Sequence, residues 1–264
     1  MQEGFSTLRF TREGPIAEVT LTRPGILNRI DATAHRELVE VFRRLEDIEG
    51  VRAVVFASEG KVFSAGGDFD LMLAGNADLA TRQQMVDEAM RLLGSLLDVA
   101  PPVIVALHGD AIGLGATLVL ACDAVVSHPT CRISDPHVNI GLVAGDGGCL
   151  VWPQSVGMLR AKRHLLTGDP LTGSDAHGMG LVTDLVAAPA EVLPAARALA
   201  GRIAALPPVA VQGTKRALNA VLRLRFGEVM PVALAHEMTS LGSDDLREAI
   251  AAFKERRPPD YRGR

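Results

Sequence analysis

Two glycine-rich turns stand out in the sequence as places where backbone N–H groups could contact a ligand. One is the block Phe63-Ser-Ala-Gly-Gly-Asp-Phe69, and the other is Gly113-Leu114-Gly115, which follows the apolar run 103–107. The first amides of a helix have no intrahelical acceptor, and glycine lets a backbone approach a ligand closely. The helix dipole adds partial positive charge at that end. The turn at 113–115, which opens a predicted helix, could therefore hold an oxygen on which negative charge develops.

Two ionisable residues follow these turns, His137 in Ser134-Asp-Pro-His137 and Asp146 in Gly145-Asp-Gly-Gly148. An imidazole titrates near about 6.5 and can give or take a proton at neutral pH, although a single histidine is often only structural. Asp146 can move a proton or cap a helix that begins near Gly147. Both alternatives stay open for each residue.

Composition and missing motifs exclude several function classes. The 264 residues include 27 Lys and Arg against 31 Asp and Glu, a net charge of −4 that disfavours broad binding to nucleic acid or anionic membranes. GxGxxG, P-loop, GxSxG and HExxH patterns are absent, and no clustered metal-ligand spacing occurs. We therefore expect no metal site. Three cysteines without a CxxC pair, no leader and no apolar stretch of spanning length predict a cytoplasmic protein outside the membrane.

Hydrophobic periodicity predicts short strands that alternate with helices. Asp31 is a candidate N-cap for a helix with Leu38, Val41 and Phe42 on its apolar face, which ends at Gly50. The chain beyond Gly147 is mostly helical, and Pro207-Pro208 marks a boundary before helices that reach Glu255. Expected strands are 7–12, 16–21, 53–57, 103–107, 123–127 and 181–186, and further expected helices are 81–99 and 115–121. This recurrence predicts an α/β coil of repeating turns, although periodicity alone does not exclude a doubly wound sheet.

The stretch 108–123 and the block 63–69 resemble two hallmarks of the crotonase superfamily, the enoyl-CoA hydratase/isomerase family, and most of the chain matches the family pattern. The resemblance implies a crotonase-like spiral of repeated β-β-α turns over 1–205 and a C-terminal helical oligomerisation region over 206–264. It also implies a homotrimer or a dimer of trimers. The substrate would be an acyl-CoA thioester, with coenzyme A as part of the substrate and no separate cofactor. By position, the Gly67 and Leu114 N–H groups would form the oxyanion hole.

The acid and base positions depart from the family pattern. Family hydratases hold water between two glutamates, and Thr117 and His137 stand at those positions. Thr117 cannot act as an acid or base near neutral pH, but its hydroxyl can hydrogen-bond a water or a substrate oxygen. A family carboxylate usually stands one position before Asp146, where this chain has Gly145. The resemblance therefore implies His137, Asp146 and Thr117 as the altered catalytic set.

Several further residues are candidates for substrate binding. The resemblance implies that Ala65, Gly66, Asp68 and Gly113 lie along the bound thioester, with Asn28 in the loop before Asp31. Lys254 could meet the coenzyme A of a neighbouring subunit, or belong to a solvated basic tail. Trp152 can line the acyl pocket or belong to the core.

These observations predict an acyl-CoA enzyme of fatty acid metabolism, with water addition or elimination as the first reaction. Hydrolysis of a thioester or C–C bond and double-bond isomerisation are the alternatives, because the glutamate pair is missing. A noncatalytic acyl-CoA-binding subunit is an alternative from another class, and Thr117 is the residue that favours it. RNA binding, a third class, is disfavoured by the net charge of −4.

Overall fold

Two sheets form the frame of the computed structural model, which describes residues 4–264. Within these residues, one sheet has six strands in the order β1-β2-β3-β5-β7-β10, and the other has four in the order β4-β6-β8-β9. Pairing is parallel except for β1 with β2 and β8 with β9. The strands are β1 (Leu8–Glu13), β2 (Ile16–Leu21), β3 (Ala53–Ser58), β4 (Val62–Ser64), β5 (Val103–Leu107), β6 (Asp110–Ile112), β7 (Ala124–Ser127), β8 (Arg132–Ser134), β9 (Leu171–Thr172) and β10 (Asp184–Leu185).

Successive turns of the chain repeat one pattern. A strand of the larger sheet is followed by a strand of the smaller sheet and then by a helix, as in β5, β6 and α4. Parallel registers such as Leu107 opposite Ser127 and Ala111 opposite Ile133 stack one turn on the next. The predicted α/β spiral of β-β-α turns is confirmed. The helices are α1 (Ala32–Asp47), α2 (Phe69–Ala77), α3 (Leu79–Asp98), α4 (Leu114–Leu120), α5 (Gly148–Val156), α6 (Met158–Leu165), α7 (Gly173–Met179), α8 (Pro189–Ala204), α9 (Pro208–Leu241) and α10 (Asp244–Glu255), with 3-10 turns η1 (Pro24–Ile26) and η2 (His137–Ile140).

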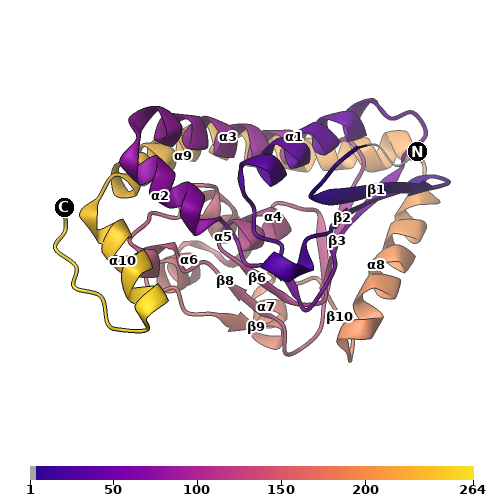
Figure 1. Cartoon of the computed structure of the whole chain (residues 1–264). Coiled ribbons are helices and arrows are strands. Elements are labelled where there is room, and N and C mark those ends of the chain that lie inside the picture. The colour runs from indigo at the N-terminus through magenta and orange to yellow at the C-terminus, as the bar shows by residue number, and fades with distance from the viewer. Residues whose placement is uncertain (1–3) are drawn as a thin grey trace.

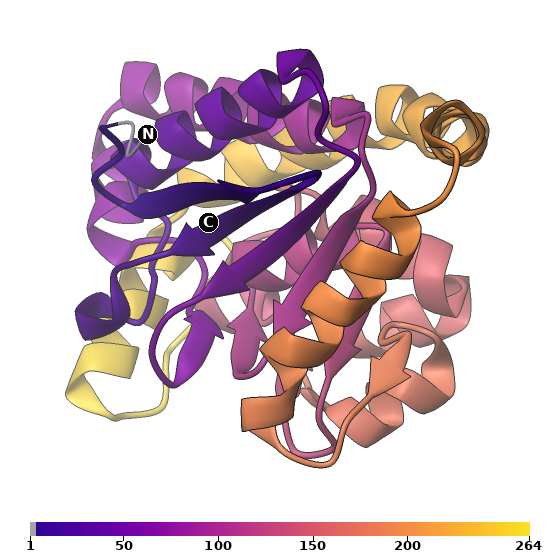
Figure 2. The same cartoon turned by 90° about the vertical axis from the view of Figure 1, so that its right-hand side faces the viewer.

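Helices enclose the larger sheet on both faces. Figure 1 shows α1, α3 and α9 running together along one side of the molecule, and Figure 2 shows α8 lying across the outer face of the larger sheet. Phe56 of β3 packs edge to face on Phe42 of α1 and on Phe63 of β4. Burial of these rings ties a helix to both sheets. Asp31 caps α1 as predicted, since its side chain accepts hydrogen bonds from the Thr33 and Ala34 amides.

Several short elements were absent from the sequence prediction. α2 begins where the Asp68 side chain accepts hydrogen bonds from the Asp70 and Leu71 amides. β4, β6 and β8 have three residues each, too few to reveal an alternation. The predicted strand 181–186 is wrong in extent, because only Asp184–Leu185 pairs with β7.

The C-terminal helices pack against helices of the spiral, α9 against α3 and α5 and α10 against α2. α9 begins at Pro208, next to the predicted boundary at 205/206, and α10 ends at Glu255 as predicted. α10 packs against α2, where Phe253 meets Phe69 edge to face with ring centroids 5.4 Å apart. Oligomerisation through this region stays a prediction. No helix within residues 4–264 has both the length and the apolarity needed to cross a membrane.

Candidate active site

The two glycine-rich turns meet at their backbones. Gly66 has a φ of +82°, and a Cβ atom there would lie 2.5 Å from the Ile112 carbonyl oxygen, so no larger residue fits. The Ile30 amide donates to the Gly66 carbonyl and keeps that turn in place. Leu114 is the first residue of α4, so its N–H has no intrahelical acceptor. Gly67 and Leu114 line one cavity, and an oxyanion hole formed by their two amides stays a prediction.

A small cavity and a larger groove meet next to Gly67. An enclosed cavity of about 50 Å³ reaches between α1, α3 and α9. A groove of about 870 Å³ runs over η1, the Gly66 turn and α10. Gly67, Met72 and His137 border both. Of the predicted substrate contacts, Ala65, Gly66 and Gly113 line the groove and Asp68 lines the enclosed cavity.

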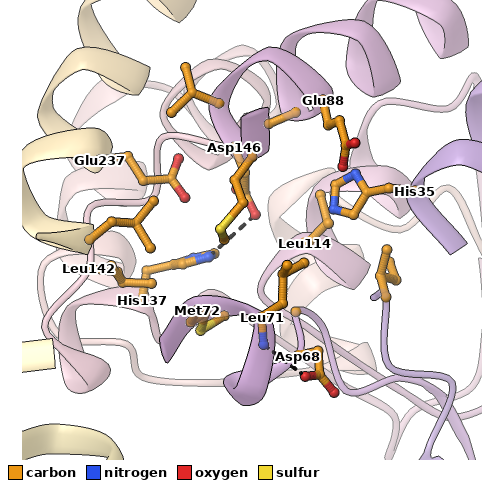
Figure 3. A pocket seen from close by; sticks show the side chains of 16 residues that line it. His35, Asp68, Leu71, Met72, Glu88, Leu114, His137, Leu142, Asp146 and Glu237 are labelled. Carbon is orange, nitrogen blue, oxygen red and sulfur yellow. Dashed lines mark hydrogen bonds and ion pairs between the residues drawn. The ribbon is translucent and has the colours of Figure 1, made fainter. Parts of the chain in front are cut away.

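His137 lies between two buried carboxylates. Its Nδ1 is hydrogen-bonded to Asp135 Oδ1, and its Nε2 lies 3.3 Å from Asp146 Oδ2 (Figure 3). Burial alone would lower the pKa of His137, but Asp135 and Asp146 together raise it well above the ordinary value of about 6.5. Burial would raise the pKa of Asp146, and the neighbouring His137 lowers it instead. At neutral pH His137 is therefore an imidazolium that holds Asp146 in its ionised form.

The donor atoms of Asp135, His137 and Asp146 lie within 4.8 Å of one another, so they are the described residues that could hold a metal ion. Both ring nitrogens of His137 already face a carboxylate oxygen. We therefore interpret the cluster as one that holds and moves protons, with Asp135 as the residue that positions the ring.

Thr117 lies behind Asp146 and not in the cavity wall. Its buried hydroxyl donates to Asp146 Oδ1 over 3.5 Å, a weak hydrogen bond that helps to orient the carboxylate. The N-cap of α5 is Gly147, which has no side chain to cap the helix, but the Gly148 amide at the start of α5 donates a hydrogen bond to the Asp146 carboxyl and helps to lower its pKa. Its carboxylate points toward His137, and Thr117 is a positioning residue.

Glu237 is a site residue that the sequence reasoning missed. It lies on α9 and lines the enclosed cavity on the same side as His137 (Figure 3). Its Oε2 has no hydrogen-bond partner in the described part of the chain. Burial, reinforced by Asp146, raises the pKa of Glu237 to about 8, so the group is largely a neutral acid at pH 7. A Cβ atom at Gly145 would lie 2.7 Å from Glu237 Oε2, so this carboxyl occupies the space beside position 145.

His35 and Glu88 also line the enclosed cavity, from α1 and α3. No local pattern links these residues or Glu237 to the glycine turns, because each lies on a separate helix. The sequence signal that could have indicated these residues is an ionisable side chain among the apolar residues of one helix face.

Three predicted substrate contacts lie elsewhere. Asn28 Nδ2 donates to the Glu59 and Val62 carbonyls, so its side chain holds the loop that precedes α1. Trp152 is fully buried, stacks on His164 and borders neither hollow. Asn28 and Trp152 are therefore structural residues here. Lys254 is exposed and lies 3.8 Å from Asp70, and its contact with a neighbouring subunit stays a prediction.

Comparisons with known proteins show the family and the fold. A family model described as enoyl-CoA hydratase/isomerase matches residues 11–264. A carnitinyl-CoA dehydratase from Citrobacter koseri is 32% identical over 98% of this chain and 99% of its own length. A short-chain-enoyl-CoA hydratase from Clostridium acetobutylicum is 30% identical over 93% and 94%. The crystal structure of an enoyl-CoA hydratase/isomerase from Mycobacterium paratuberculosis superposes with a TM-score of 0.88 at 33% identity, covering 93% of this chain and 97% of that one.

Proposed function

The chain belongs to the enoyl-CoA hydratase/isomerase family and has its crotonase fold, and from that premise we propose that it adds water to a short enoyl-CoA thioester or eliminates it. Coenzyme A is then part of the substrate, and no separate cofactor takes part. Two of the relatives are named for hydration or dehydration of CoA thioesters, which supports this choice of reaction.

The thioester is proposed to lie where the two hollows meet, with coenzyme A in the groove and the acyl chain in the enclosed cavity. The large groove volume of about 870 Å³ suits an extended ligand. Arg29 lines this groove with its guanidinium 3.0 Å from Asp68, and Lys254 lies at the α10 edge beside Asp70. These cations suit the phosphates of coenzyme A.

The proposed reaction uses two carboxyl groups with opposite protonation states. Ionised Asp146, held by His137, takes a proton from water as the oxygen attacks Cβ. The electrons of the double bond move to the thioester oxygen, which the Gly67 and Leu114 amides stabilise. Neutral Glu237 then protonates Cα. Its pKa exceeds that of Asp146, so the proton returns from Asp146 to Glu237 and restores the starting state.

One observation carries this proposal. A carboxyl with a lowered pKa, Asp146, and a carboxyl with a raised pKa, Glu237, line the same cavity as the Gly67 and Leu114 amides. An acid and a base that act at the same pH need different pKa values, which their surroundings in the protein provide. This pair can replace the two glutamates that the sequence lacks.

Incubation with a four-carbon enoyl-CoA in ¹⁸O-labelled water tests the reaction. Hydration consumes the conjugated double bond and places the label on Cβ. We expect wild-type turnover and a loss of about 10²-fold or more in kcat for Asp146→Asn and for Glu237→Gln, because each removes a proton-transfer group.

The competing functions give different products in the same assay. Thioester hydrolysis would release a free thiol, and isomerisation would move the double bond without taking up label. Binding without any turnover on a broad panel of acyl-CoA thioesters would favour the noncatalytic subunit and refute the proposed hydratase.

A further inference from the structure

The enclosed cavity has a polar wall that the hydration chemistry does not use. In Figure 3, His35 and Glu88 lie at one side of the cavity, while His137 and Glu237 lie at the other, with Asp146 between them. The remaining wall is largely apolar and includes Met72, Met85, Val86, Ala89 and Leu142. A plain hydrocarbon chain needs no histidine or carboxyl at that side.

His35 is an unsatisfied polar residue in this wall. The residue is 8% exposed, and its Nδ1 has no hydrogen-bond partner among residues 4–264. A buried polar atom without a partner is destabilising, so binding of a ligand that supplies the partner is favoured. Burial lowers the pKa of His35 despite the opposing charges of Glu88 and Asp146, so the neutral ring presents one donor and one acceptor.

Glu88 provides a second polar group beside it. The residue is also 8% exposed, and Gln84 Nε2 donates to its Oε1 over 2.8 Å. Its Oε2 accepts no hydrogen bond within the described chain, which leaves an acceptor for a ligand hydroxyl. A hydroxyl has both a donor for Glu88 and an acceptor for the His35 N–H, whereas an anionic group would be repelled by Asp146, whose pKa is lowered.

The volume of the cavity limits the length of the chain. About 10–15 Å³ is the least that holds one water molecule, so a cavity of about 50 Å³ suits a short acyl chain better than a long one. We propose that His35 and Glu88 form a subsite for a hydroxyl group at the end of a short acyl chain, which gives the enzyme its acyl specificity.

This inference rests on the proposed acyl-CoA function for its ligand, but it can be tested without turnover. Calorimetry compares the binding of two saturated thioesters, butyryl-CoA and 4-hydroxybutyryl-CoA, which differ only by the terminal hydroxyl. We expect wild-type protein to bind the hydroxylated ligand at least about tenfold more tightly, because the apolar analogue leaves buried polar groups unpaired.

Variants assign that preference to the subsite. His35→Leu should reduce the ratio of the two Kd values to about one, and Glu88→Gln should reduce it severalfold. Met158→Leu, an apolar change at an exposed position of α6 that borders neither hollow, should leave the ratio at its wild-type value. If His35→Leu does not fold, the wild-type and Glu88→Gln ratios still decide the matter.

The outcomes separate this inference from the function on which it rests. Equal wild-type binding of both ligands, or a preference that survives His35→Leu and Glu88→Gln, would overturn the hydroxyl subsite while leaving the hydratase proposal intact. A wild-type preference for 4-hydroxybutyryl-CoA in a protein that turns over no enoyl-CoA would support the subsite and refute the hydratase. Binding of neither thioester would overturn both.

Discussion

The Leu114 amide can be removed by changing one residue at the start of α4. Proline is favoured at the first position of a helix because that N–H has no intrahelical acceptor, so Leu114→Pro deletes a donor without breaking the helix. We expect a loss of about 10²–10³ in kcat, the usual cost of one oxyanion donor. Leu114→Ala, which keeps the amide, should lose far less. Comparable kcat values for the two variants, with unchanged melting temperatures, would remove Leu114 from the oxyanion hole.

Glu237 links the stability of the protein to pH. Its pKa is about 8 in the folded chain and about 4.5 when exposed, so the folded state binds the proton more tightly. Between pH 4.5 and pH 8, Glu237 is ionised in the unfolded chain but protonated in the folded chain. The free energy of unfolding of the wild type therefore falls as pH rises through this range. Glu237→Gln cannot ionise.

The Glu237→Gln variant should therefore gain stability relative to wild type as pH rises. We expect similar unfolding free energies at pH 4 and an advantage of a few kcal/mol for the variant at pH 8, measured by urea denaturation. His137 is present in both proteins, so its own titration largely cancels in the difference. A difference that does not vary with pH would show that Glu237 has an ordinary pKa.

Sequence reasoning reached the site residues that follow a local pattern. Gly67 and Leu114 lie in glycine turns next to strands, and His137 follows Pro136 within a short block. Glu237, in contrast, enters the cavity from α9, more than 90 residues beyond Asp146 in the chain. Its proximity depends on how α9 packs over the spiral, which no spacing rule states.

At the scale of elements, the packing of α9 on the loop before α5 determines the position of Glu237. A Cβ atom at Gly145 would lie 2.6 Å from the Ala233 carbonyl oxygen and 2.7 Å from Glu237 Cβ. A backbone oxygen in a helix moves only with the helix. Gly145→Ala should therefore displace α9 and reduce stability by about 1–3 kcal/mol, as overpacking does.

A matched control lies on the same helix. Gly213 is exposed, and nothing lies within 4 Å of a Cβ atom built there, so Gly213→Ala should be neutral or stabilise by up to about 1 kcal/mol. Urea denaturation measures both variants, and kcat reports the movement of Glu237 in Gly145→Ala. If Gly145→Ala matches wild type in stability and kcat, the contact between the loop and α9 is looser than the distances indicate.

Elements with a strong period were predicted more closely than short ones. β2 and β5 match their predicted bounds, because apolar runs of five or six residues between turn signals are distinctive. The smaller sheet was missed, since β4, β6 and β8 each have three residues and are held by neighbours from distant parts of the chain. β4 and β6 of this smaller sheet lead directly into the two glycine turns. The pairing of β4 with β6 therefore sets the positions of Gly67 and Leu114 relative to each other.

At the scale of the whole molecule, the C-terminal helices complete the site and also expose an apolar face. Glu237 comes from α9, and Phe253 of α10 lines the groove. At 100° per residue, Leu218, Val221 and Leu224 lie on one side of α9 together with Val232. These side chains are 58% to 70% exposed in the single chain. Contiguous exposed apolar surface of this kind marks association sites.

This face is where the trimer implied by the family resemblance can be tested. Sedimentation velocity should find wild-type protein as a trimer or a dimer of trimers, and Leu218→Glu combined with Val221→Glu should shift it to smaller species by burying charge in the contact. Val209→Glu is the control, because Val209 is 86% exposed and lies about two and a half turns before Leu218, near the start of α9 and outside the cluster 218–232. A monomeric wild type at micromolar concentration, or a double variant that sediments like wild type, would show that this face of α9 does not hold subunits together.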